Sequence, residues 1–505
     1  MKHLKPYIYP FVLFVLSFIL RLSLISKGPY HIDTLSLMLG AERLLETGHL
    51  QYEFGPGYPL TTLLSAAFIL ITRLLGINDA VFAINLTSVV FGSLCVPLVY
   101  LIGKRLFNSL AGALAATLFS LSPIFLGISV YGKSHAPSLF FLLAAVLFLL
   151  KYQESYRLMH LYLAGIAAGL LGAARLQELA LMIIPFAYLY FVGAKQEAPS
   201  VPPLPLTKRM THFIHAGLLA LGTALLFHLP FLFQGEFSGF QHQLSTFWHQ
   251  GLTNNFRGFF SNSLVRSSNF LVRNFTQIGY ITIIIGFCWL IKISWRLSGF
   301  LLLWVVVPLA FYGNLYSTVP RFFTPFLPAL YLVLGFTLAK LYRFNRLFKG
   351  SVLFILVCIL ELSALTVLPS LSLRHKYALL PDYARWVGQV TEDNARIIVT
   401  DEGKFISYYG KRTPFGRPAS AIGLKEEDMI EFREKLDSLL AQHIPVYITD
   451  LAIFSYNPHE EFSQLIVENY NTELIGQKAY ESWHTDVLEP LLFPNALYKL
   501  SPLPR

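Results

Sequence analysis

The sequence is poor in cysteine and in charge. Its 3 cysteines are Cys95, Cys288 and Cys358, and each lies inside an apolar run. They show no metal-ligand spacing, which argues against a disulfide framework and a cysteine metal site and predicts small core residues. Charged residues make up 13% of the 505 residues and hydrophobic residues 54%. A soluble protein carries roughly twice that charged share, so an ordinary soluble protein is excluded.

Acidic residues are scarcest in the first 373 positions. Residues 1–373 hold 10 Asp and Glu against 25 Lys and Arg, whereas residues 374–505 hold 19 against 14. Apolar runs of about 18–25 residues, long enough to span a membrane as helices, recur in the first part. The composition predicts a polytopic α-helical membrane domain over 1–373 and a small soluble domain over 374–505. The basic excess indicates cytoplasmic loops and anionic ligands, not nucleic acid.

About eleven membrane-spanning helices are predicted. They lie near residues 7–26, 81–102, 110–130, 135–151, 160–175, 177–193, 211–233, 275–291, 299–317, 323–341 and 351–369. A further apolar run, residues 58–75, decides the side of every later loop. If this run lies along or dips into the outer interface, the Lys/Arg clusters fall on the cytoplasmic side, as the positive-inside tendency favours. We therefore expect it not to cross, and we expect the soluble domain on the outer face.

Asp33 lies just past the first predicted span, on the outer face. A helix is predicted from about residue 33 to 46, with Glu42 and Glu46 one turn apart and facing water. One interpretation makes Asp33 the N-cap of this helix, whose carboxylate accepts backbone N–H groups. The other interpretation makes it a functional carboxylate at the lipid–water boundary.

Three stretches follow a common pattern. Asp33 is followed by the amphipathic helix and then by FGPGYPL at 54–60. KSHAPSLFFLLAAVLFLLKY at 133–152 begins a long apolar helix after an outer loop. VPRFFTPFLPALYLVLG at 319–335 begins another helix with an arginine, an aromatic residue and two prolines. In order and spacing these stretches resemble the integral-membrane glycosyltransferases of the GT-C class. They look most like glycosyltransferase family 39, the protein O-mannosyltransferase and aminoarabinose-transferase group.

This resemblance implies a GT-C membrane enzyme that uses a sugar carried on a polyprenyl phosphate, dolichyl or undecaprenyl. It would transfer a hexosyl or pentosyl group to an acceptor glycan, lipid or protein on the non-cytoplasmic side, with inversion. In the family an acidic residue of the first outer loop acts on the acceptor, so Asp33 is the predicted base, although Thr34 stands where the family often has Glu. Arg321 matches the family arginine and is the leading donor-phosphate ligand.

Weaker phosphate ligands are Lys133, Arg175 and Arg257, for which snorkelling to membrane lipid headgroups is the simpler interpretation. An aromatic-rich stretch at 240–260 is expected to wall a cleft for the prenyl chain. Ser134 and His135 stand where the family has an acidic residue.

A metal site is an open alternative. His135 and Glu178 are predicted to contact the acceptor or a metal, and together with Asp33 they could bind Mn or Zn better than Mg or Ca. We expect no required cofactor, leave a divalent cation open, and favour a hydrogen-bonding role for His135. Glu361, inside the last span, keeps a transporter or flippase for a lipid-linked sugar as the rival function. Against that rival, Glu361 stands alone and no inverted repeat is visible.

The last 130 residues alternate between helix and strand patterns. Strands are predicted near 395–400, 445–450, 473–479 and 496–500, and helices at 425–443 and 459–470. This alternation predicts a small α/β domain with a partly parallel sheet. It contains no phosphate loop or nucleophile elbow, and Asp401–Glu402 is interpreted as a solvated cap. We expect the domain to recognise the acceptor or to cover the site.

Overall fold

The computed structural model describes residues 5–50, 58–194, 205–233, 264–313, 319–344, 346–400, 402–418, 425–455, 460–481, 488 and 492–503. The chain forms two compact units. The membrane unit comprises Met1–Ser26, Ser36–Leu373 and Asp486–Glu489. The sheet unit comprises Lys27–Leu35, Arg374–Thr485 and Pro490–Arg505. The short segment Lys27–Leu35, which carries Asp33, therefore belongs to the sheet unit, whereas the chain before and after it belongs to the membrane unit.

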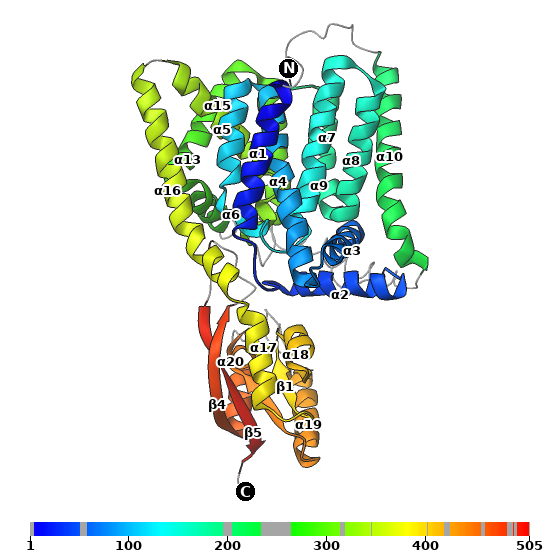
Figure 1. Ribbon diagram of the computed structural model, residues 1–505, viewed down its shortest axis with the longest axis vertical. Coiled ribbons are helices and arrows are strands. Elements are labelled where there is room, and N and C mark those ends of the chain that lie inside the picture. The colour runs from blue at the N-terminus through cyan, green and yellow to red at the C-terminus, as the bar shows by residue number, and fades with distance from the viewer. Residues whose placement is uncertain are drawn as a thin grey trace. The chain divides into compact units, whose positions relative to one another are not determined.

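The membrane unit is helical (Figure 1). Its elements are α1 (Lys5–Leu22), α2 (Ile32–Thr47, which starts in the sheet unit), α3 (Pro59–Leu74), α4 (Ala80–Leu106), α5 (Ser109–Ser120), α6 (Pro123–Ile128), α7 (His135–Ser155), α8 (Leu158–Ala174), α9 (Leu176–Phe191), α10 (Leu206–Phe233), α13 (Leu264–Ile293), α14 (Trp295–Tyr312), the 3₁₀ helix η2 (Pro320–Phe323), α15 (Leu327–Phe344) and α16 (Arg346–Lys376, which ends in the sheet unit).

Seven described helices are long and apolar enough to cross a membrane: α4, α7, α10, α13, α14, α15 and α16. Shorter apolar helices of 10–17 residues accompany them, among them α1, α5, α8 and α9. Many of their outward side chains are large and hydrophobic, such as Phe11 at 65% exposed and Leu226 at 63% exposed. Such a surface would be unstable in water over so many helices, so the chain is a multi-pass membrane protein.

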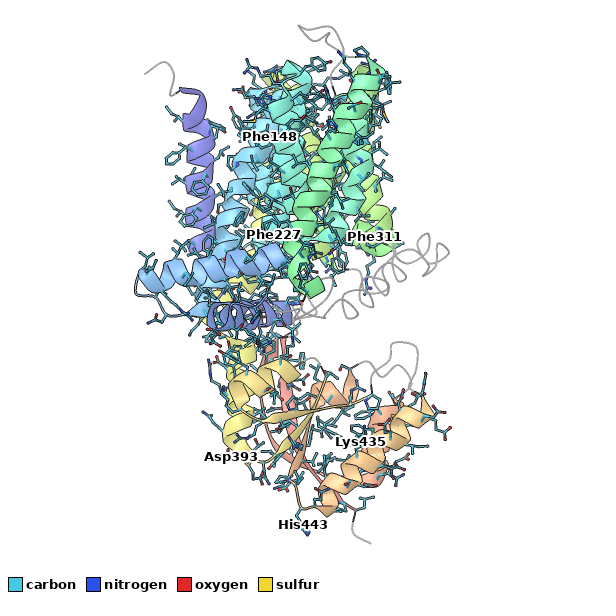
Figure 2. The ribbon with its side chains drawn as sticks, turned by 90° about the vertical axis from the view of Figure 1, so that its right-hand side faces the viewer. Phe148, Phe227, Phe311, Asp393, Lys435 and His443 are labelled. Atoms are coloured by element: carbon cyan, nitrogen blue, oxygen red, sulfur yellow. The ribbon has the colours of Figure 1, made fainter. Side chains whose placement is uncertain are left out.

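Helix α3 runs crosswise to the long helices of the membrane unit in both views (Figures 1 and 2). This direction agrees with the prediction that residues 58–75 lie along an interface. Its buried face is unusually polar, because Thr61, Thr62, Ser65 and Thr72 are all buried on it. A helix with such a face is better suited to lie on protein than to face hydrocarbon.

The single span predicted at 110–130 is wrong. The structure has two helices there, α5 and α6, with a break at Leu121 and Ser122. Pro123 occupies the first position of α6, where its missing N–H costs nothing, and the Ser122 hydroxyl accepts the Phe125 N–H at 3.4 Å. The Ser-Pro pair therefore ends one helix and starts the next.

Small residues allow the central helices to approach closely. A Cβ added to Gly103 of α4 would lie 2.7 Å from the Cα of Gly112 in α5. A Cβ added to Gly335 of α15 would lie 2.5 Å from the Ala111 carbonyl oxygen. Both contacts are too short for a larger residue, so α4, α5 and α15 pack backbone to backbone, as small-residue crossings in membranes do.

The sheet unit is an α/β domain, as predicted. Its further elements are α17 (Leu379–Val390), β1 (Arg396–Val399), α18 (Gly403–Gly410), β2 (Thr413–Gly416), α19 (Glu426–Ala441), β3 (Val446–Thr449), α20 (Asp450–Phe454), α21 (Glu461–Asn469), β4 (Tyr470–Glu481) and β5 (Leu492–Pro502). The strand order is β2-β1-β3-β5-β4. The β1/β2 and β1/β3 pairs are parallel, and the β3/β5 and β4/β5 pairs are antiparallel. A buried cluster around Ile398, Leu436, Ile448 and Phe462 forms its core.

The interpretation of Glu402 as a solvated cap is wrong. Glu402 is fully buried. Its Oε2 atom accepts hydrogen bonds from the backbone N–H of Thr400 at 3.2 Å and from the Thr400 hydroxyl at 2.9 Å. Its Oε1 atom accepts a hydrogen bond from the Thr449 hydroxyl at 2.6 Å. Glu402 thus joins the ends of the adjacent strands β1 and β3 in the interior. Asp401, its predicted companion, lies outside the described residues.

Candidate active site

The structure separates the predicted site residues into three groups. Lys133, His135, Arg175, Glu178 and Arg321 belong to the membrane unit, and Asp33 belongs to the sheet unit. Arg257 and the whole stretch 240–260 lie outside the described residues. The membrane-unit residues lie at or next to the ends of α7, α8, α9 and η2.

The loop before α7 is fixed by polar side chains of α4. Asn85 accepts the Gly132 N–H at 2.7 Å and donates to the Ser26 carbonyl at 2.9 Å. The Ser88 hydroxyl accepts the Lys133 N–H at 3.0 Å and donates to the Lys133 carbonyl at 3.3 Å. Lys133 is only 3% exposed. Because protein encloses this lysine, the structure does not support snorkelling of Lys133 to lipid headgroups.

Arg21 supports the same loop from α1. It is fully buried, and its Nε donates to the Ser129 hydroxyl at 2.8 Å, while Nη1 donates to the Ser17 hydroxyl at 2.6 Å. The Phe125 ring centroid lies 5.1 Å from its Cζ atom. These neutral partners hold the cation inside the bundle, where an unsolvated charge would otherwise be costly. No role was predicted for Arg21 from the sequence.

Arg175 forms the centre of the membrane-unit cluster. It lies in extended backbone between α8 and α9, and its Nε lies 2.7 Å from Oε1 of Glu178, in the first turn of α9. Its Nη1 donates to the Ser134 hydroxyl at 2.9 Å and lies 3.5 Å from Nε2 of His135. Arg175 and Glu178 are 3% and 1% exposed. This ion pair is enclosed, so Arg175 is not a headgroup contact.

Aromatic residues close this cluster. The Tyr58 ring centroid lies 5.2 Å from Cζ of Arg175, and Tyr312 at the end of α14 is close enough to interact electrostatically with the same guanidinium. Tyr312 stacks on Phe322 with ring centroids 5.3 Å apart. Phe322 lies 6.5 Å from the His135 ring. Sequence reasoning missed both tyrosines, because aromatic residues at helix ends look like ordinary interface residues.

Phe322 connects Arg321 to the cluster. Arg321 lies in η2, is 8% exposed, and directly precedes Phe322 in the chain. The Arg321 carbonyl accepts the Thr324 hydroxyl at 2.6 Å, which fixes the short helix. The prolines and the arginine of the quoted stretch therefore form a compact turn whose aromatic residue packs against Tyr312.

Several charged side chains are buried at these helix ends. Lys133, Arg175, Arg321 and Glu178 are all buried. Buried charges are expensive in a low-dielectric interior, and buried cations are stabilised by an anionic partner. Cations at these positions are chemically suited to bind a phosphate group.

A divalent cation does not fit this cluster. His135 Nδ1 and Glu178 Oε1 lie 4.0 Å apart, but Arg175 contacts both side chains, and a guanidinium there repels a metal ion. Within the part of the chain that the structure describes, no group of three or more His, Cys, Asp or Glu side chains could hold a metal.

Asp33 lies in the first turn of α2, and the N-cap interpretation of it is wrong. The cap is His31, whose Nδ1 accepts the Asp33 backbone N–H at 3.0 Å. His31 is buried and the Asp33 side chain is 26% exposed. His31 Nδ1 also lies 3.5 Å from Oδ1 of Asp33. Because Nδ1 accepts the amide hydrogen, it carries no proton to donate to this carboxylate, and the two side chains do not form a hydrogen-bonded ion pair through it. The helix dipole favours an ionised carboxylate at this position.

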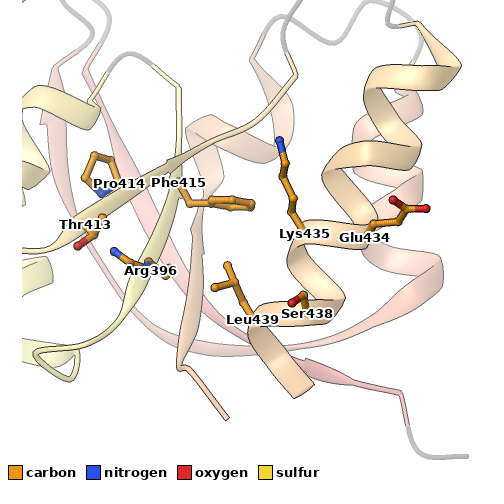
Figure 3. A pocket seen from close by; sticks show the side chains of 8 residues that line it. All are labelled: Arg396, Thr413, Pro414, Phe415, Glu434, Lys435, Ser438 and Leu439. Carbon is orange, nitrogen blue, oxygen red and sulfur yellow. The ribbon is translucent and has the colours of Figure 1, made fainter. Parts of the chain in front are cut away.

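The sheet unit also has an open cleft that the sequence did not predict (Figure 3). Its volume is about 630 Å³, and it lies between β1, β2 and α19. The lining residues are Arg396, Thr413, Pro414, Phe415, Glu434, Lys435, Ser438 and Leu439. None of the predicted site residues lines it. No local signal marks it, because it forms only where a strand pair and a later helix pack together.

The whole chain is similar to solved membrane glycosyltransferases. It matches ArnT from Cupriavidus metallidurans bound to undecaprenyl phosphate over 98% of each chain, with 11% identity and a TM-score of 0.59. It matches the Archaeoglobus fulgidus oligosaccharyltransferase AglB, in complex with an inhibitory peptide and a dolichol-phosphate, over 93% of this chain and 73% of that one, with 13% identity and a TM-score of 0.58. It matches the arabinofuranosyltransferase AftD from Mycobacteria over 98% of this chain and 40% of that one, with 14% identity and a TM-score of 0.50.

These likenesses define the fold, which is that of the GT-C glycosyltransferases, and they confirm the predicted resemblance. Residues 59–225, from α3 into α10, match the family model described as dolichyl-phosphate-mannose-protein mannosyltransferase. Comparison with curated proteins finds no match.

Proposed function

We propose that this protein is an integral-membrane glycosyltransferase. It moves a sugar from a dolichyl- or undecaprenyl-phosphate donor to an acceptor on the non-cytoplasmic side. The observation that carries the proposal is the burial of three cations, Lys133, Arg175 and Arg321, at or next to helix ends of the membrane unit. The family match and the GT-C neighbours support it, since the ArnT structure binds undecaprenyl phosphate and the AglB structure a dolichol-phosphate.

Within this proposal the cations have different roles. Arg321 binds the donor phosphate, and Lys133 provides a second positive charge. Arg175 already contacts Glu178, Ser134 and His135, so its role is to position His135 and the loop before α7. His135 contacts the acceptor or the sugar rather than a metal.

The reaction is a single displacement. The acceptor hydroxyl oxygen attacks the anomeric carbon, the bond from that carbon to the phosphate oxygen breaks, and its electron pair leaves with the phosphate. Asp33 takes the hydroxyl proton. Attack opposite the leaving group inverts the anomeric configuration. A positioned carboxylate contributes about 10²–10⁴-fold in such a step. The cations stabilise the charge that grows on the phosphate.

The test combines two measurements on the full-length protein. Mass spectrometry of the glycans, glycolipids and glycoproteins in a deletion strain, complemented with the wild type, identifies the acceptor. Complementation with Asp33→Asn is expected to leave the modification absent, whereas the protein level and undecaprenyl phosphate binding remain. Full modification with Asp33→Asn overturns the proposed base. Movement of a lipid-linked sugar across vesicles without loss of the sugar from its phosphate would instead establish a flippase.

No feature of the described residues favours the flippase. That alternative depended on Glu361 as a buried carboxylate. The structure places Glu361 in α16 with its side chain exposed, so it does not lie in the interior of the membrane unit.

A further inference from the structure

The segment that carries Asp33 is attached to the sheet unit through Arg374. The Lys27 N–H donates to the Arg374 carbonyl at 2.9 Å, and the Lys27 ammonium donates to the Lys376 carbonyl at 3.2 Å. The Arg374 guanidinium carbon lies 3.3 Å from the centroid of the Tyr30 ring. Tyr30 is 5% exposed. Backbone and side-chain contacts therefore hold the residues just before Asp33 to the end of α16.

Arg374 is itself held by the sheet. Its Nε and Nη2 donate to Oε1 of Glu481, the last residue of β4, at 3.0 Å and 2.9 Å. The two side chains are 2% and 4% exposed. An enclosed ion pair is sensitive to geometry, because losing either partner leaves an uncompensated charge. One guanidinium thus stacks on Tyr30 and bonds to β4.

Gly28 adds a steric requirement. A Cβ placed on Gly28 would lie 2.8 Å from Cβ of Ala378 and 3.3 Å from its Cα. Only a residue without a side chain lets the two segments approach this closely. The contact lies five residues before Asp33 and involves no charge, so it reports on the attachment independently of Arg374.

We infer that the sheet unit positions Asp33. Arg374 and Glu481 are positioning residues, and Gly28 sets the distance between the segment that carries Asp33 and Ala378. The inference rests on the proposed role of Asp33 as the base. The sheet unit then does more than recognise an acceptor or cover a site, because it carries and orients a reacting group. A displacement of about 1 Å at a reacting group can cost about 10²-fold in rate.

The first test is a double-variant cycle at the glycine contact. Gly28→Ala adds the clashing methyl group, and Ala378→Gly removes its counterpart. We expect Gly28→Ala to lower kcat at least tenfold with KM for the donor within twofold, and the Gly28→Ala/Ala378→Gly protein to recover most of that loss. Additive effects, or wild-type kcat in Gly28→Ala, would overturn the inference.

The second test uses the ion pair. Arg374→Lys keeps the charge but loses the two-nitrogen contact with Glu481 and the planar stack on Tyr30. We expect lower kcat with unchanged undecaprenyl phosphate binding and a shifted acid limb in the kcat–pH profile. Arg385→Ala is the matched control, because this arginine of α17 forms a surface pair with Asp382. If Arg374→Lys fails to fold, the glycine cycle decides.

The two proposals fail in different ways. If Asp33→Asn retains wild-type kcat, the proposed base is wrong and the positioning role falls with it. If Asp33→Asn is inactive while Gly28→Ala and Arg374→Lys retain wild-type kcat and an unshifted pH profile, only the positioning role is wrong.

Discussion

Replacing Glu178 with glutamine tests the charge balance of the membrane-unit cluster. The substitution keeps the size of the side chain but removes its negative charge, so the Arg175 guanidinium 2.7 Å away loses its carboxylate. Both side chains are almost completely buried, and breaking a buried pair from one side costs about 3–5 kcal/mol. The glutamine oxygen can still accept a hydrogen bond from Arg175, so we expect the lower part of that range, about 3 kcal/mol.

The same substitution should strengthen anion binding. Without the Glu178 carboxylate, the charge of Arg175 is no longer neutralised by this partner, and a phosphate gains in attraction. A change of about 1.4 kcal/mol would be a tenfold change in Kd. We therefore expect Glu178→Gln to be thermally less stable than the wild type without ligand, and undecaprenyl phosphate to raise its transition temperature more than it raises that of the wild type.

The assay is thermal unfolding in detergent micelles at several undecaprenyl phosphate concentrations, with heating rate held constant because unfolding of membrane proteins is often irreversible. Glu154→Gln is the matched control, since Glu154 forms an exposed pair with Arg105 in the same unit. An unchanged transition temperature without ligand would refute the buried pair. Equal or smaller stabilisation by the lipid in Glu178→Gln would refute its place beside an anion site.

Two further predictions concern single side chains. Arg321→Ala should raise the Kd for undecaprenyl phosphate about tenfold to a hundredfold in a binding titration, because charged hydrogen bonds contribute about 1.5–3 kcal/mol. Arg321→Lys should recover part of the lost affinity. Equal binding by the wild type and both variants would exclude Arg321 as the phosphate ligand. Glu392 in the sheet unit is largely exposed, and its slight burial raises its pKa. Hydrogen bonds from the Tyr447 hydroxyl at 2.5 Å and the Lys499 ammonium at 2.9 Å outweigh this burial and hold the pKa below its usual 4.5. The ionised form is thus favoured by folding, and stability from this group is present above about pH 4.5 and lost as the pH falls through the lower folded-state pKa. Glu392→Gln should therefore lower the transition temperature at pH 7, by an amount equivalent to less than about 1 kcal/mol because the pair is partly exposed, and the difference from the wild type should vanish at low pH; a difference that persists there would contradict the assignment.

The membrane part was largely predictable from hydrophobic length and charge. The run at 58–75 was predicted not to cross because crossing would have put the lysine and arginine clusters outside. This stays a prediction, and the crosswise direction of α3 is compatible with it (Figures 1 and 2). The break between α5 and α6 carried a local signal, the Ser122–Pro123 pair, which a count of apolar residues overlooks.

The candidate site was predictable only in part. The three-residue spacing of Arg175 and Glu178 at a helix start is typical of an ion pair, yet the two were expected in separate roles. Tyr312 and Ser134 join them from elements far apart in the sequence, so no local pattern reveals the contact. The same holds for Arg374 and Tyr30, which meet only because the chain returns to the sheet unit more than 300 residues later.

Under the proposed function, the charge of the cluster distinguishes the transition state from the bound donor. A donor phosphodiester carries one negative charge, and the departing lipid phosphate approaches two. A cation that binds the phosphate attracts the more highly charged departing group more strongly than the donor, so the interaction strengthens as the bond to the sugar breaks. An interaction that grows in this way lowers the barrier, whereas one that held the donor equally well would only tighten binding. Asp33 belongs to the sheet unit and the cations to the membrane unit, so the proposal assigns proton removal and phosphate stabilisation to different units of the chain.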